Sequence, residues 1–134
     1  MTDLPDEDLL SHFDSSNDFI SDCIERQGGS CLVHCFRGRS RSATVVAAYL
    51  MLKHGYSATK ALAKIRSRRP SINPHESYQA QLKMYEAMDY TIDATNIQLK
   101  VWILLYNLDI INNFHENNLI SFMRKLKISI LLFF

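Results

Sequence analysis

The chain has 134 residues, a formal net charge of +1 and 47% hydrophobic residues, which suits one globular domain with a buried core. The near-neutral charge argues against a protein that binds nucleic acid through a broadly basic surface, and against a polybasic membrane anchor. No apolar stretch reaches the roughly 18 residues of a membrane helix, so we expect no membrane span. Three cysteines and the lack of a charged-then-apolar leader favour a reducing compartment, and we expect a cytoplasmic or nuclear protein.

The first predicted elements are an acidic segment and an amphipathic helix. Asp3, Asp6 and Asp8 stand around an apolar Leu-Pro pair, which by itself is typical of a solvated loop. The spacing of apolar residues predicts a helix over 14–27 that ends at a glycine pair. Its expected buried face carries Phe19, Ile20, Cys23 and Ile24.

Next comes a short apolar run that leads into a nine-residue loop and a second helix. The run Cys31–Val33 is typical of a buried strand, so Cys31, like Cys23, is expected to be a small core residue. The residues from Ser42 to His54 have the composition of a buried helix. The loop between them, His34–Ser42, therefore joins a strand end to a helix N-terminus, where unpaired N–H groups and the helix dipole favour an anion.

This loop carries residues suited to phosphoryl chemistry. A thiol beside cations at a helix N-terminus becomes a thiolate near neutral pH, and Cys35 meets that condition. Six positions later, Arg41 offers a planar donor fork that matches two phosphate oxygens. Gly38 permits a tight turn, and the Ser42 hydroxyl is placed to donate to the sulfur. His34 precedes the nucleophile on an extended segment, so we expect it to support the loop from the opposite face.

Two further helices follow. Ser57 is expected to cap a helix that runs to about Arg68, with Ala58, Ala61, Leu62 and Ile65 inward, and Pro70 closes it. The arginines near its end are expected to be solvated or to cap carbonyls. The residues from Ser77 to Asp89 repeat apolar side chains at helical spacing, with Tyr78, Leu82, Tyr85 and Met88 as core. The sequence leaves open where the Gln81 side chain of that helix points, and solvent exposure is one possibility.

The last third of the chain differs in composition. Residues 100–134 are rich in Ile, Leu, Phe, Asn and Lys and contain no glycine or proline. We expect a divergent tail of uncertain structure here, either an alternative end to the protein or an extra helix that covers exposed core.

The loop and the helical run Ala43–Met51 resemble the dual-specificity protein phosphatases of the cysteine-phosphatase superfamily. The resemblance extends from about Asp3 to about Lys100, and Gln81–Tyr90 is most similar to the subgroup that carries a C-terminal zinc-binding domain. No cysteine follows Cys35, so that zinc site cannot be built here. The resemblance implies an α/β fold with a central mixed sheet flanked by helices. It implies a partial catalytic domain over residues 1–99, with N-terminal strands missing and open sheet edges as a consequence.

The resemblance also implies roles for individual residues. Asp3, which precedes Cys35 by 32 positions, corresponds to the acid that protonates the leaving oxygen, with Asp6 and Asp8 as alternatives. Cys35 is the implied nucleophile, Arg41 the phosphate ligand and Ser42 the hydroxyl that assists departure of the sulfur. The rest of the phosphate-binding loop is Phe36, Arg37, Gly38, Arg39 and Ser40, supported by His34 and His75. No metal and no other cofactor are implied.

The implied substrate is a phosphorylated protein, bearing phosphotyrosine and phosphoserine or phosphothreonine. Arg37 and Arg39 stand where the family usually has small or apolar residues. If they point inward, the pocket suits polyanions such as phosphoinositides or an RNA 5′-triphosphate, which is the alternative activity. A second alternative is an inactive phosphate-binding or misfolded fragment. The sequence leaves the oligomeric state and the orientation of both arginines open.

Overall fold

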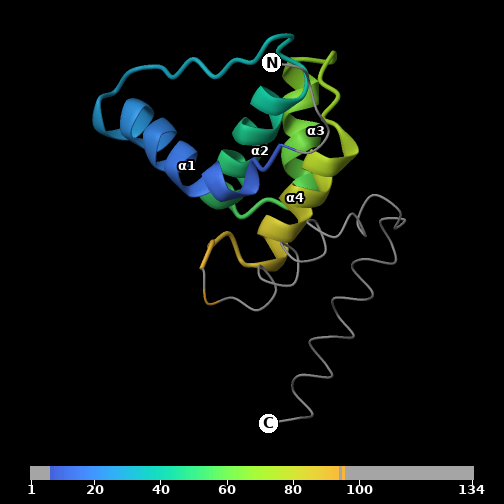
Figure 1. Cartoon of the computed structure of the whole chain (residues 1–134). Helices are drawn as coiled ribbons and strands as arrows, with labels where there is room; N and C mark the ends of the chain where they lie inside the picture. Colours follow the sequence, from blue (N-terminus) through green and yellow to red (C-terminus); the bar gives the residue numbers. More distant parts are fainter. Residues whose placement is uncertain (1–6, 94, 96–134) are drawn as a thin grey trace. The chain divides into compact units, whose positions relative to one another are not determined.

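The computed structural model describes residues 7–93 and residue 95. Every regular element in this part of the chain is helical (Figure 1): η1 (Leu10–His12), α1 (Phe13–Ser21), the π turn η2 (Asp22–Arg26), α2 (Arg41–His54), α3 (Ala58–Arg68) and α4 (Glu76–Ala87). The chain divides into two units, Met1–Ile92 and Asp93–Phe134, and these helices belong to the first. The predicted tail over 100–134 lies outside the described residues, and the predicted division at residue 99 stays a prediction.

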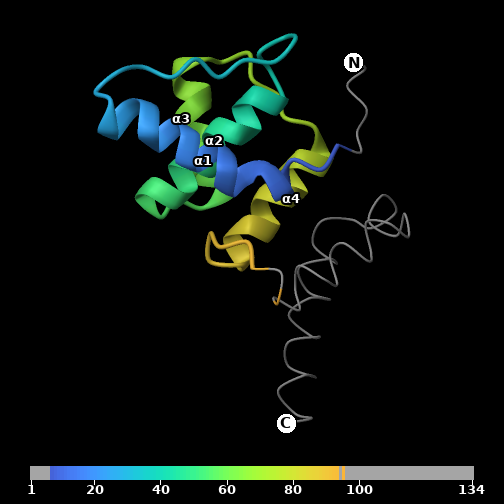
Figure 2. The same cartoon turned by 60° about the vertical axis from the view of Figure 1, so that its left-hand side comes forward.

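Helix α2 lies at the centre of this unit. It packs against α1 on one side and against α3 and α4 on the other, as Figure 1 shows; Figure 2 gives the same helices after a turn of the view. Buried side chains fill the space between the helices, among them Phe13 of α1 and Tyr85 of α4, whose rings meet edge to face with centroids 5.2 Å apart. The small residues Ala43, Ala47 and Ala48 are buried on α2 and let the neighbouring helices approach it closely.

Local sequence signals set the ends of the helices as predicted. Gly55 follows α2 with φ of +62°, the left-handed conformation that glycine adopts without strain. The Ser57 hydroxyl accepts a hydrogen bond from the N–H of Lys60 at 3.1 Å and so caps α3. The N–H of Ala58 donates to the Glu86 carboxylate at 2.8 Å, so α4 also holds the start of α3.

The predicted core of the last two helices is confirmed. Ala58, Ala61 and Leu62 are buried on α3, while Ile65 is half-buried. On α4 and just after it, the predicted positions Tyr78, Leu82, Tyr85 and Met88 are all buried. Helical spacing therefore predicts the inner faces of α3 and α4 correctly.

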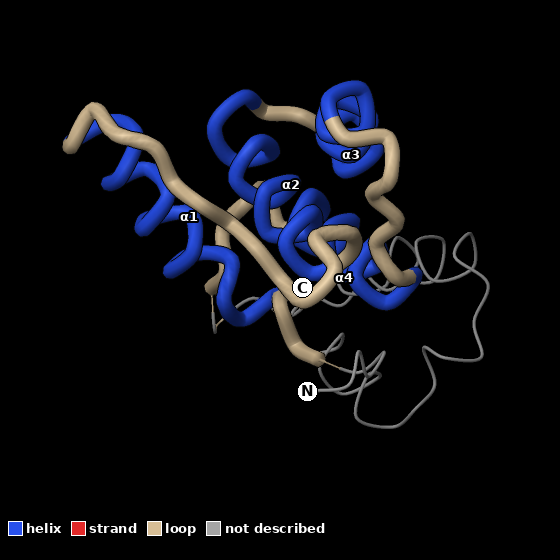
Figure 3. The backbone as a smooth tube through the Cα atoms, turned by 90° about the horizontal axis from the view of Figure 1, so that it is seen from above, coloured by secondary structure: helices blue, strands red, loops and turns tan. Residues whose placement is uncertain are grey.

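The predicted strand is not formed by the described residues. Cys31–Val33 is extended chain that runs from the end of η2 toward the loop, as the tan tube in Figure 3 shows. A strand requires a hydrogen-bonded neighbour, and residues 7–93 supply no second strand with which it could pair. Leu32, expected to be buried, is 85% exposed, and Cys31 is only half-buried. The sheet of the predicted α/β fold is thus absent from the described residues.

The first amphipathic helix is present, but its predicted inner face is wrong in part. Phe13, Asn17 and Ile20 are the residues that α1 buries. Phe19 is 64% exposed and Ile24 is 42% exposed. The α-helix ends at Ser21 and a π turn follows, which changes the angular position of Cys23 and Ile24 relative to a continuous helix. Cys23, expected in the core, is half-buried.

Candidate functional site

The candidate site lies where the extended segment ends and α2 begins. Cys35 closes the extended segment, residues 36–40 bend, and α2 starts at Arg41. Ser40 occupies the N-cap position but its side chain makes no capping hydrogen bond. The first N–H groups of α2 are therefore not occupied by that hydroxyl, and the positive end of the helix dipole faces the loop.

The Cys35 thiol is surrounded by hydrogen-bond donors. Its sulfur lies 3.3 Å from the Ser42 hydroxyl oxygen. Partial burial raises the pKa of Cys35, but hydrogen bonds from the Ser42 hydroxyl and from the backbone N–H groups of Ser42, Ser40 and Gly38 outweigh it. The resulting pKa is about 7, well below the ordinary value for a cysteine. A substantial part of Cys35 is therefore thiolate at neutral pH, as a nucleophile requires.

Alkylation of Cys35 by iodoacetamide should titrate with a midpoint near pH 7, because only the thiolate reacts and its pKa is about 7. In Ser42→Ala a hydrogen bond that lowers the pKa is lost, so the midpoint should move to higher pH and alkylation at pH 7 should slow several-fold. Mass spectrometry of the Cys35 peptide measures the rate at each pH. Cys31 in the same digest serves as the internal control, and an unmoved midpoint in the variant would contradict the assigned role of the Ser42 hydroxyl.

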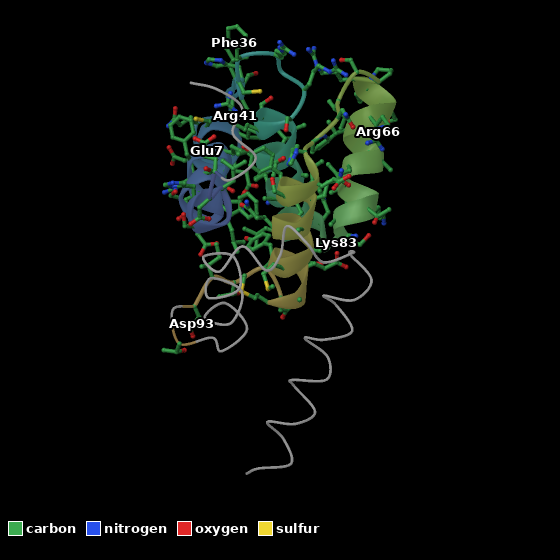
Figure 4. The ribbon with its side chains drawn as sticks, turned by 45° about the vertical axis from the view of Figure 1, so that its right-hand side comes forward. Glu7, Phe36, Arg41, Arg66, Lys83 and Asp93 are labelled. Carbon is green, nitrogen blue, oxygen red and sulfur yellow. The ribbon has the colours of Figure 1, made fainter. Side chains whose placement is uncertain are left out.

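Arg41 is the first residue of α2, and its side chain is mostly buried, with 14% exposed. Its Nη1 atom lies 3.6 Å from the Glu7 carboxylate, and Figure 4 shows both residues below Phe36, on the side of the loop that faces the helices. Burial at the base of the loop limits the rotamers of the guanidinium group. Arg41 is thus held beside the anion-attracting end of α2.

The two additional arginines of the loop lie differently from Arg41. The Arg39 guanidinium donates through Nε to the carbonyl of Ser71 at 2.9 Å, so it is engaged with the segment that precedes α4. Arg37 is exposed. Phe36, at the outer end of the loop, is 86% exposed and is labelled in Figure 4.

The loop is tied to residues 69–75 by backbone and side-chain hydrogen bonds. Arg69 donates through Nε to the carbonyl of Gly38 at 3.1 Å, and the N–H of Asn73 donates to the carbonyl of Arg39 at 2.9 Å. Gly38 has φ of +62°, and a Cβ there would lie 3.0 Å from Arg69 Nη2. Glycine thus serves two needs at this position, the left-handed turn and the close approach of the arginine.

The two histidines predicted to support the loop are both exposed. The backbone N–H of His75 donates to the Ser40 hydroxyl at 3.1 Å, which joins the start of α4 to the loop. The His75 ring turns the other way: its Nδ1 lies 2.9 Å from the Ser77 hydroxyl and accepts from the N–H of Ser77 at 3.3 Å. The loop contact of His75 is thus made by its backbone, while its ring caps α4.

The predicted acid, Asp3, and its alternative Asp6 lie outside the described residues, and Asp8 is exposed. The sequence reasoning missed two contacts: the pairing of Glu7 with Arg41 and the burial of Gln81. The second had a signal, because Gln81 follows Tyr78 by three positions and precedes Tyr85 by four, which places it on the buried face of α4.

Among the residues that the structure describes, no helix is long and apolar enough to cross a membrane.

Comparison with known proteins places this site in a family. Residues 1–88 match the dual specificity phosphatase catalytic domain. Dual specificity protein phosphatase 1 of Arabidopsis thaliana is 46% identical over 86 residues, which cover 64% of this chain and 43% of that protein. Tyrosine-protein phosphatase yvh1 of Schizosaccharomyces pombe is 36% identical over 101 residues, covering 75% of this chain and 30% of that protein.

A solved structure gives the same result for the fold. The crystal structure of human DUSP28 superposes with a TM-score of 0.63 at 40% sequence identity, covering 68% of this chain and 61% of that chain. The chain therefore spans about half or less of the curated relatives named above, and somewhat under two thirds of this structure.

Proposed function

Because the chain belongs to the dual specificity phosphatase catalytic domain family, we propose that it hydrolyses phosphate monoesters on proteins through Cys35. The observation that carries the proposal is the Cys35 thiol, whose pKa is about 7, at the N-terminus of the helix that Arg41 begins. The proposed substrates are phosphotyrosine and phosphoserine or phosphothreonine side chains.

In the first step the Cys35 thiolate attacks phosphorus, the S–P bond forms and the ester P–O bond breaks. We propose that the backbone N–H groups at the start of α2 and the Arg41 guanidinium bind the phosphoryl oxygens as charge shifts toward them. The departing oxygen takes a proton from an acid, for which we propose Asp3. Protonation matters most for the alkoxide of serine or threonine, which is a poorer leaving group than a phenolate.

In the second step water attacks the cysteinyl phosphate, the S–P bond breaks and the thiolate is restored. The proton of the attacking water passes to the carboxylate that the acid left in the first step, and inorganic phosphate leaves. The Ser42 hydroxyl, 3.3 Å from the sulfur, is proposed to donate to it as negative charge returns. The same hydrogen bond lowers the pKa of Cys35 in the free protein. One hydroxyl thus stabilises the thiolate both before attack and after release.

The phosphoinositide or RNA 5′-triphosphate alternative has less support. Arg39 is engaged with the carbonyl of Ser71 and Arg37 is exposed, so the described contacts do not direct either cation toward the thiol. We also propose, from the sequence resemblance and the composition, membership in the subgroup with a C-terminal zinc-binding domain and a cytoplasmic or nuclear location.

Hydrolysis of p-nitrophenyl phosphate by the purified full chain tests the proposed function. We expect turnover that vanadate inhibits, and acid-quenched protein that carries one phosphoryl group on the Cys35 peptide by mass spectrometry. The control is the same chain alkylated at Cys35 before the assay. A cooperatively folded chain without turnover and without the phosphorylated peptide would overturn the proposal and leave only phosphate binding.

A further inference from the structure

Gln81 joins α4 to the segment that precedes α1. Its side chain is completely buried, with 0% exposed. Its Oε1 atom accepts from the N–H groups of Leu9 at 2.9 Å and Leu10 at 2.8 Å, and its Nε2 atom donates to the carbonyl of Glu7 at 3.0 Å. Both ends of the amide therefore bind the backbone of residues 7–10, which lie 71 to 74 positions earlier in the chain.

The segment depends on this amide for the cap of its first turn. Leu9 is the N-cap residue of η1 and offers no side-chain cap, so the Gln81 oxygen takes the place of a local capping group. An amide in a buried site must find partners for its donors and its acceptor, and a substitution that removes it leaves backbone groups unsatisfied. Gln81 thus binds the backbone of residues 7–10 to α4, beside the buried Leu10 side chain and the Asp8 carboxylate, which accepts from the N–H of Ser11 at 3.1 Å.

The held segment reaches the phosphate-binding loop. The carbonyl of Glu7 is bound by Gln81, and the carboxylate of the same residue lies 3.6 Å from Arg41. One residue therefore connects α4 with the guanidinium at the start of α2. In the sequence, Asp3 stands four positions before Glu7, so the chain that carries the proposed acid leaves from this fastened point.

We propose that Gln81 is a positioning residue for leaving-group protonation: it fixes Glu7–Leu10 on α4 and thereby sets where the acid-bearing residues before them start. This inference rests on the proposed function. A general acid acts only within hydrogen-bond reach of the departing oxygen. A displacement of about 1 Å can cost roughly 100-fold in rate, so the anchor of the acid segment affects chemistry without touching substrate.

The test compares phenyl phosphate, whose leaving group needs protonation, with 2,4-dinitrophenyl phosphate, whose leaving group does not. In Gln81→Leu, kcat/KM should fall about tenfold for phenyl phosphate and stay within about twofold for the dinitrophenyl ester. Gln81→Glu keeps an acceptor for Leu9 and Leu10 but loses the donor to Glu7. Its ratio of kcat/KM for phenyl phosphate to kcat/KM for the dinitrophenyl ester should therefore fall by about threefold. The ratio of the two kcat/KM values is independent of the fraction of protein that is folded.

Glu86→Leu is the matched control, since it also removes a long-range cap made by α4, at the N–H of Ala58. It should lower the melting temperature and leave the substrate ratio at the wild-type value. Should Gln81→Leu yield no folded protein, the ratio in Gln81→Glu decides alone. Unchanged ratios beside an active wild type overturn the positioning role and leave the proposed function standing, whereas an inactive wild type overturns both.

Discussion

Replacing Cys35 with serine should abolish turnover of p-nitrophenyl phosphate, with a fall in kcat of at least about 10⁴-fold. The pKa of the Cys35 thiol is about 7, so a substantial part of the wild-type sulfur is ionised at the assay pH, while a serine hydroxyl in the same place stays protonated. The described hydrogen-bond partners of Cys35 are the Ser42 hydroxyl and backbone N–H groups, and none of these is a base that could take the proton of such a serine. The measurement is initial rate against substrate concentration for both proteins at pH 7.

Cys31→Ser is the matched control for this substitution. Cys31 lies four positions before Cys35 on the same extended segment and is also half-buried, but it is outside the loop. We expect its kcat to stay within about threefold of wild type, because Cys31 lies outside the loop whose N–H groups and Ser42 hydroxyl surround the Cys35 sulfur. Residual activity in Cys35→Ser that vanadate still inhibits would show that a different nucleophile is responsible.

Replacing Arg41 with alanine should reduce kcat/KM for an aryl phosphate by roughly 10³-fold, with most of the loss in kcat. In the proposed mechanism the guanidinium presents two parallel donors to the equatorial phosphoryl oxygens and retains its charge throughout the reaction. Arg41→Lys should recover only a small part of the loss, since an ammonium group lacks the planar fork. Steady-state kinetics of the three proteins, with a thermal melt of each, provide the measurement.

Arg66→Ala serves as the control for charge alone. Arg66 is exposed on α3 and is labelled in Figure 4 away from the loop. Its loss should leave kcat/KM within about twofold of wild type, because salt screens an exposed charge that lies outside the site. An Arg41→Lys variant with wild-type kcat would contradict bidentate binding and would indicate that positive charge alone is sufficient.

Much of the local structure follows from the sequence alone. Gly55 and Ser57 mark the end of α2 and the start of α3, because a left-handed turn and a hydroxyl cap depend only on neighbouring backbone. The spacing of Tyr78, Leu82 and Tyr85 likewise predicts the buried face of α4. The spacing of Cys35, Arg41 and Ser42 places one thiol, one guanidinium and one hydroxyl at a helix N-terminus.

Tertiary structure decided what depends on distant partners. Cys31–Val33 has the composition of a strand, but pairing needs a second strand, and residues 7–93 provide none. Phe19 fits the inner face of a long helix, yet α1 gives way to a π turn after Ser21 and buries Phe13, Asn17 and Ile20 instead.

The environment of the candidate site shows the same division. Helical spacing places Gln81 on the buried face of α4 but does not indicate its partners, and Glu7 has no signal in the sequence. Folding brings Glu7 to Arg41 and the Gln81 amide to the backbone of residues 7–10. The sequence by itself determined the chemical groups of the loop and the helix that follows it. Which groups orient and anchor them was decided by contacts between residues 31 to 74 positions apart, which no local pattern encodes.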